Sequence, residues 1–187
     1  MKPTAATVLP ATRQPVGQSP GRDRGAPYRL VVLGSETADA VSGAGGLIVD
    51  AVRAGWRVAM YLEIAPEPRA LRILGVEDGQ LLEADVGFGP GEADAVVFAA
   101  DIYHRHRGVR RCLADAVRRG APDVAAWGGP WSAAPASASD VDHRLSPAAR
   151  AFKSYAMQAT GTATPAGPAE RFYGGLHRLI ATSPPPE

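Results

Sequence analysis

The chain has 187 residues, 45% of them hydrophobic, and its 20 Lys and Arg residues almost balance 19 Asp and Glu residues, giving a net charge of +1. This length predicts one domain, because domains cluster at roughly 100–150 residues, and so small a charge gives no electrostatic reason to expect nucleic acid as a partner. The single cysteine excludes an internal disulfide, and no window approaches the ~20 consecutive apolar residues of a membrane span. The composition therefore predicts a soluble, cytoplasmic globular protein.

Proline marks both ends of the chain. Five Pro residues and few large apolar side chains precede residue 28, and residues 183–187 read Ser-Pro-Pro-Pro-Glu. Such segments bury too little apolar surface to offset their ordering entropy, and the start of the chain lacks the apolar core of a secretory signal. We therefore expect disordered tails over residues 1–27 and 182–187, flanking one domain over residues 28–181.

Apolar runs typical of buried strands alternate with apolar stripes typical of helices. The expected strands cover residues 29–33, 57–64, 80–83, 93–99 and 123–127. The expected helices cover residues 44–52, 67–74, 109–117 and 146–158. This alternation predicts right-handed crossovers and a mainly parallel sheet covered on both faces, which is a Rossmann-like three-layer α/β/α fold.

Chemistry-bearing side chains follow two of these strands. Ligands of parallel sheets bind beyond the carboxyl ends of the strands, and the loop after residue 33 carries Glu36 and Asp39, three residues apart. The segment after residue 99 is expected to be a loop. Its candidate side chains are Asp101, Tyr103, His104 and His106. Two carboxylates and a histidine that meet in one crevice can hold a divalent metal with open positions.

Four short motifs occur in a recognisable order along the chain. They are Gly45-Gly46, Leu74-Gly75-Val76, His106-Arg107 and Lys153-Ser-Tyr-Ala-Met-Gln158. Their order and spacing resemble the PIG-L/LmbE family of metal-dependent N-acetylglucosaminyl de-N-acetylases. That family has a strand, Pro-His-Pro-Asp-Asp-Glu, a Gly-Gly pair, Leu-Gly-Val, His-Pro-Asp-His-Arg and a last helix ending near Ser-Gln. The resemblance covers roughly residues 29–175.

Counted back from the Gly-Gly pair, the resemblance implies a metal site on Glu36, Asp39 and His106. Glu36 stands where the family has His, whereas Asp39 and His106 keep the family residues. The family's general base falls on Ala38, which cannot accept a proton. General-base assistance is typically worth ~10²–10⁴ in rate, so this departure predicts slow or absent amide hydrolysis unless Glu36 or Asp101 replaces the base.

The later motif also departs from the family. Tyr103 stands where the family has His, and Arg105 stands where it has Asp. A cation at that position repels a metal and removes a carboxylate that orients a ligand. Alternatively, Arg105 and Asp101 contact the substrate, with Arg105 holding an anionic group.

Two hypotheses of function follow from the resemblance. In the first, the protein is a hydrolase that deacetylates an N-acyl sugar or a similar small amide, with Zn, Mn, Fe or Mg as the metal and with Tyr103 or His104 stabilising the oxyanion. In the second, it is an inactive relative that binds a ligand or a partner protein, with or without a metal. A small molecule is the expected partner, and homo-oligomerisation stays open.

Simpler explanations remain for the same residues. Glu36 and Asp39 are also favoured at a helix start by the helix dipole, and His104 and His106 fit an exposed basic run at the start of a helix. The glycines of residues 43–46 match a dinucleotide site poorly, because no Gly-x-Gly-x-x-Gly follows the strand.

Overall fold

The computed structural model describes residues 26–83, 93–118, 123–177 and 179. Within these residues, seven strands form one sheet in the order β3-β2-β1-β4-β5-β7-β6. The strands are β1 (Arg29–Gly34), β2 (Arg57–Leu62), β3 (Asp78–Leu81), β4 (Ala95–Ala99), β5 (Asp123–Trp127), β6 (Ser139–Arg144) and β7 (Ala169–Gly174). Apart from residues 26 and 27, the predicted tails lie outside the described residues.

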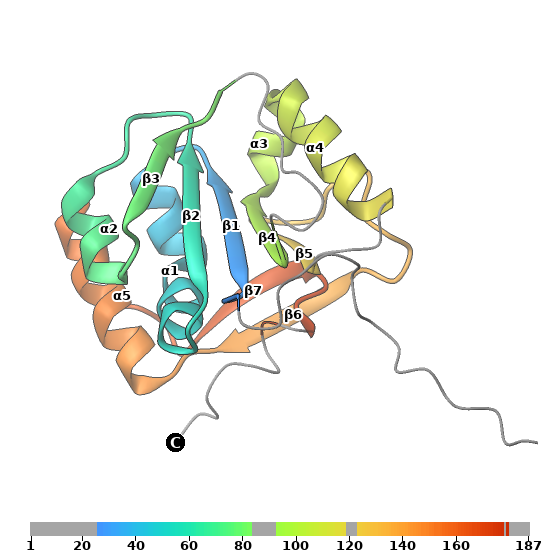
Figure 1. The fold of residues 1–187 in the computed structure, drawn as a ribbon. Helices are drawn as coiled ribbons and strands as arrows, with labels where there is room; N and C mark the ends of the chain where they lie inside the picture. The colour runs from blue at the N-terminus through green and yellow to red at the C-terminus, as the bar shows by residue number, and fades with distance from the viewer. Residues whose placement is uncertain (1–25, 84–92, 119–122, 178, 180–187) are drawn as a thin grey trace, which may run out of the picture.

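Helices cover both faces of the sheet. They are α1 (Thr37–Arg53), α2 (Pro68–Leu74), α3 (Ala100–Arg105), α4 (Arg107–Arg118) and α5 (Pro147–Ala159). The helices α1, α2 and α5 pack against one another on one face, and α3 and α4 lie on the other (Figure 1). The predicted three-layer α/β/α fold is therefore confirmed. None of the described helices is long and apolar enough to cross a membrane.

The centre of the sheet is parallel, as the apolar runs predict. β1 pairs in parallel with β2 on one side and with β4 on the other. The side chains of residues 30–33 are fully buried, which explains why this strand is apolar at every position rather than at alternate ones. The carboxyl ends of three neighbouring strands consequently meet at one edge.

The predicted loop after residue 99 is wrong, because α3 begins directly at the end of β4. Asp101 lies in the first turn of α3, where the helix dipole favours a carboxylate. Arg105 follows four residues later, and its Nη2 lies 2.8 Å from Asp101 Oδ2. Such an i,i+4 pair supports a short helix, and no proline interrupts this segment.

The two antiparallel strands β6 and β7 are absent from the sequence prediction. Among the described strands, β6 pairs with β7 alone, and it carries charged residues at alternate positions. β7 alternates between exposed or half-buried residues and the buried Glu170, Phe172 and Gly174. That alternation is a strand signal, but a carboxylate on the buried side conceals it.

A buried ion pair joins α5 and β7 to the middle of α1. Lys153 Nζ lies 2.6 Å from Glu170 Oε1 and 2.6 Å from the Ser42 carbonyl oxygen. The Glu170 carboxylate also accepts hydrogen bonds from the backbone N–H groups of Gly46 (2.7 Å) and Leu47 (2.8 Å). Complete burial raises the pKa of Glu170, and Lys153 and the two N–H groups oppose this shift. Backbone groups inside α1 are thus bonded to side chains from outside the helix.

A second buried network fixes the start of α5. Asp50 of α1 lies 3.1 Å from His143 Nε2 of β6 and accepts a 2.6 Å hydrogen bond from the Ser146 hydroxyl. Ser146 also caps α5, because its hydroxyl accepts from the N–H of Ala149 at 3.1 Å. Burial raises the pKa of Asp50, but the hydrogen bonds from His143 and Ser146 outweigh burial and lower the pKa below its ordinary value of 3.8.

We expect Gly43→Ala to destabilise the protein and Gly45→Ala to leave it unchanged or more stable. A methyl group on Gly43 would lie 2.2 Å from the Trp127 ring, whereas one on Gly45 would meet Lys153 Cγ at 3.4 Å. Overpacking of this kind costs about 1–3 kcal/mol, and a helical Gly→Ala change without a clash gains roughly 0.5–1 kcal/mol. Urea unfolding of both variants measures the difference, and equal stability of the two would contradict this packing.

We also expect Asp50→Asn to lower the free energy of unfolding at pH 7 by about 1.5–3 kcal/mol, since a buried charge-assisted hydrogen bond is lost. Because the folded pKa of Asp50 is lowered, its contribution is complete above the unfolded pKa of about 3.9. The contribution disappears as the pH falls through the folded pKa. The difference in the free energy of unfolding between wild type and Asp50→Asn, measured by urea titration, should therefore become smaller below about pH 4.

Asp142→Asn is the matched control on β6. Its carboxylate is exposed and pairs with Arg171 at 3.3 Å, and such surface pairs contribute only about 0–1 kcal/mol. A pH-independent effect of Asp50→Asn, or an equal effect of Asp142→Asn, would refute the role given to Asp50.

Candidate functional site

Polar side chains gather where the carboxyl ends of β1, β2 and β4 meet. Ser35 and Glu36 follow β1, Glu63 follows β2, and α3 supplies Asp101 and Arg105 after β4. Asp39, in the first turn of α1, completes what we call the carboxyl-end cluster: Ser35, Glu36, Asp39, Glu63, Asp101 and Arg105. Six polar residues from four segments therefore share one edge of the sheet.

The guanidinium group of Arg105 bonds to three members of the cluster. Its Nη2 donates to Ser35 Oγ at 2.8 Å and to Asp101 Oδ2 at 2.8 Å, and it lies 3.1 Å from Glu63 Oε2. The Ser35 hydroxyl in turn donates to Asp101 at 3.3 Å. The Arg105 side chain is 52% exposed, so the cation remains accessible to a molecule that arrives from solvent.

The carboxyl group of Asp39 has a raised pKa. Burial raises the pKa of Asp39, and the negative charges of Asp101 and Glu36 raise it further. The indole N–H of Trp127, which donates to both carboxylate oxygens at 3.3 and 3.4 Å, and the cation of Arg105 lower it. The net shift of the pKa is upward, and both Asp101 and Glu36 lie within electrostatic reach of Asp39.

His106 lies between α3 and α4, and its ring accepts a hydrogen bond. The N–H of Val109 donates to His106 Nδ1 at 3.3 Å, at the first turn of α4. A neutral imidazole that accepts at Nδ1 carries its proton on Nε2. No lone pair of the His106 ring is then free for a metal while this bond is made.

Tyr103 and His104 occupy different environments on α3. Tyr103 is only 5% exposed, and its ring lies 6.2 Å from the ring of Phe98 in the core. The ring of His104 is exposed and stands edge-on to Tyr103 at 5.7 Å. Within the described part of the chain, neither side chain hydrogen-bonds to the carboxyl-end cluster. Their predicted role at an oxyanion stays a prediction.

The described arrangement does not fit a divalent metal ion. Among the residues that the structure describes, no group of three or more His, Cys, Asp or Glu side chains is arranged to hold one. The predicted ligands Glu36, Asp39 and His106 all belong to the described part. The nearby carboxylates Glu63 and Asp101 are already paired with Arg105, and a cation there repels a second cation.

Three contributors to the site were missed or underrated in the sequence. Ser35, Glu63 and Trp127 are not among the candidate site residues that the sequence predicts. The positions of Ser35 and Glu63, immediately after parallel strands, are the signal that could have identified them. Trp127 is 88 residues from Asp39 in the chain, and no local pattern links the two.

Comparisons with known proteins identify the fold. The sequence matches no protein-family profile and no curated protein. A crystal structure of a deacetylase–teicoplanin complex aligns with a TM-score of 0.55 and 14% identity, over 79% of this chain and 97% of that chain. An antimicrobial pseudoaglycone deacetylase aligns with a TM-score of 0.54 and 15% identity, over 81% and 98%. The zinc-inhibited form of a teicoplanin deacetylase aligns with a TM-score of 0.53 and 14% identity, over 80% and 98%.

These neighbours belong to the PIG-L/LmbE deacetylase family. The fold resemblance that the motifs predict is therefore confirmed: the chain has the three-layer fold of these deacetylases. At 14–15% identity, the similarity establishes the fold, and the chemistry of this chain has to be argued from its own side chains.

Proposed function

We propose that this chain uses the deacetylase fold to bind an N-acyl sugar or a similar small amide at the carboxyl-end cluster, and that it hydrolyses the amide slowly or not at all. The observation that carries the proposal is the guanidinium of Arg105, which bonds to Ser35, Glu63 and Asp101 at the edge where ligands of this fold bind.

The cluster suits a polar, uncharged ligand with several hydroxyl groups. Carboxylates accept hydrogen bonds, guanidinium groups donate them, and a sugar offers both kinds of partner. The Arg105 and Asp101 side chains are 52% and 61% exposed, so both can contact a ligand without leaving their positions. The three structural neighbours described above are named as deacetylases, which favours an acylated ligand.

Two features argue against efficient hydrolysis. Ala38 stands where the family resemblance places the general base, and the loss of such a base costs ~10²–10⁴ in rate, or roughly 3–5 kcal/mol of barrier. Arg105 supplies positive charge to the cluster, but a guanidinium stays protonated and cannot act as a base.

A metal-dependent deacetylase is the second candidate. It would use Glu36, Asp39 and His106 as ligands for Zn, Mn, Fe or Mg, and Tyr103 or His104 at the oxyanion. The electrostatic proximity of Asp39 to Glu36 and Asp101 favours it, because clustered carboxylates attract cations. It requires His106 to release the N–H of Val109.

We expect Arg105→Ala to weaken binding of N-acetylglucosamine about tenfold or more, since a hydrogen bond to a charged group is worth about 1.5–3 kcal/mol. Isothermal titration calorimetry measures the affinity. Arg107→Ala, which removes an exposed arginine two residues away, is the matched control and should leave the affinity unchanged. Equal effects of the two variants, or no binding by wild type, would contradict the proposal.

We further expect that wild type releases no amine from N-acetylglucosamine in a metal-dependent reaction. Fluorescamine measures the released amine, once after chelation of metal and once after addition of Zn, Mn, Fe or Mg. Release that requires metal and disappears in His106→Asn would favour the second candidate. Asn keeps an acceptor for the N–H of Val109 while removing the imidazole, so this variant separates a ligand from a helix cap.

A further inference from the structure

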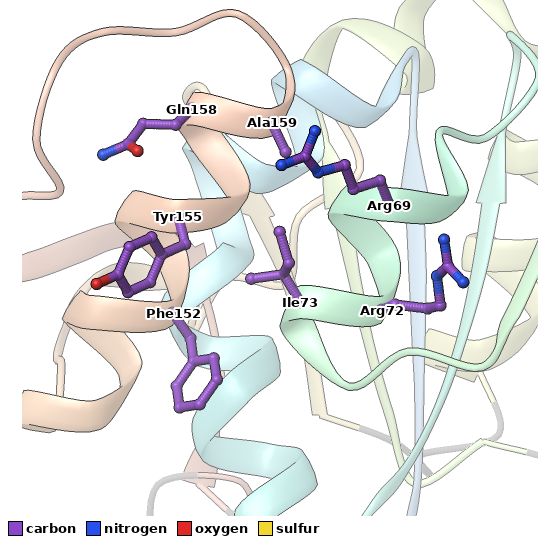
Figure 2. Close-up of a pocket in the computed structure, with 7 residues that line it drawn as sticks. All are labelled: Arg69, Arg72, Ile73, Phe152, Tyr155, Gln158 and Ala159. Atoms are coloured by element: carbon purple, nitrogen blue, oxygen red, sulfur yellow. The ribbon is translucent and has the colours of Figure 1, made fainter.

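A groove lies between α2 and α5, and its lining residues are distinct from the carboxyl-end cluster. It has a volume of about 550 Å³, with Arg69, Arg72 and Ile73 contributed by α2 and Phe152 and Tyr155 by α5 (Figure 2). In Figure 2, Ile73 lies between the two helices, and the side chain of Arg69 extends towards α5. We call this surface the α2–α5 groove.

The groove exposes apolar surface that the fold does not need for its own core. Phe152 is 45% exposed and Tyr155 is 62% exposed, whereas Ile73 is half-buried at the bottom. Exposed aromatic side chains that gather beside an aliphatic floor are typical of binding surfaces. Because both arginines and both aromatic residues are exposed, the groove is open along its length, which suits an elongated partner rather than an enclosed small molecule.

The charge of the groove is positive and locally uncompensated. Neither α2 nor α5 contains an Asp or Glu residue. Among the residues that the structure describes, no carboxylate lies within ion-pair distance of Arg69 or Arg72. Lys153, the lysine of α5, is turned inwards to Glu170. A chain with a net charge of only +1 thus presents two arginines of α2 along a groove that also exposes aromatic rings.

We infer that the α2–α5 groove docks an acidic peptide segment of another protein. An apolar side chain of the segment packs against Ile73 and the rings of Phe152 and Tyr155, and its carboxylates pair with Arg69 and Arg72. Arginine and tyrosine are the residues enriched in interface hot spots, and opposite charges accelerate association and fix its register. The inference is independent of the function proposed for the carboxyl-end cluster.

Selection from a phage-displayed library of random dodecapeptides tests the inference. The full chain is the bait, and the Arg69→Glu variant is used for counter-selection. We expect the selected peptides to combine Asp or Glu with Leu, Phe or Trp. In fluorescence polarisation with an enriched peptide, Arg69→Glu and Tyr155→Ser should each weaken binding at least tenfold. Both side chains are exposed, and circular dichroism checks that both variants fold.

Arg150→Glu is the matched charge reversal, since Arg150 is an exposed residue of α5 that does not line the groove. It should weaken binding less than twofold. Equal losses in Arg69→Glu and Arg150→Glu, or selected peptides without acidic enrichment, would overturn the inference. A dimer in sedimentation velocity that Arg69→Glu dissociates would also overturn the inference. The same holds if the chain binds no peptide but cosediments with phosphatidylglycerol vesicles, and Arg69→Glu abolishes this cosedimentation.

Discussion

The buried pair of Lys153 and Glu170 is the interaction on which the arrangement of the helical layer depends. It connects α5 and β7 to backbone groups in the middle of α1. Two buried charges are costly unless further hydrogen bonds satisfy them, and here the carboxylate has three donors while the ammonium has two acceptors. Removing one partner would leave the other charged and buried. Because α1 carries Asp39 and α5 carries the aromatic side of the groove, this pair helps to position both surfaces for which a function is proposed.

The sequence predicts the fold well where the signal is local. The apolar runs of β1 and β4 and the stripe of α1 identify the parallel half of the sheet, and the motif order indicates the deacetylase fold that the structural neighbours confirm. The sequence does not predict β6 and β7, because half of the residues of β6 are charged and β7 buries Glu170. The partner that makes this burial possible, Lys153, is 17 residues away, and the N–H group of Gly46 is 124 residues away.

The candidate site can likewise be predicted from the sequence only where the signal is local. The rule that ligands bind at the carboxyl ends of parallel strands leads to Glu36, Asp39 and Asp101 without any structure. The bonds of Arg105 could not be predicted, because the segment that carries it looks like a loop, and only a helix places Arg105 beside Asp101. The hydrogen bond of His106 to the N–H of Val109 likewise depends on α4 beginning at Arg107. The ligand set of Glu36, Asp39 and His106 therefore stays a prediction.

A guanidinium and a divalent metal ion can both reduce the repulsion between clustered carboxylates, but they do so through different interactions. Carboxylates that gather at one strand edge repel one another, which is part of the reason why the pKa of Asp39 is raised, and either cation relieves the repulsion. The guanidinium does so through directional hydrogen bonds to its neighbours, but it neither activates water nor releases a proton. Arg105 can thus preserve a polar binding surface while removing the chemistry that a metal would supply.

The carboxyl-end cluster is also connected to the helical layer. The N–H of Glu67, directly before α2, donates a 2.9 Å hydrogen bond to Thr37 Oγ1 at the start of α1. The five residues from Glu63 to Glu67 therefore connect the carboxyl-end cluster with the helix that carries the arginines of the groove.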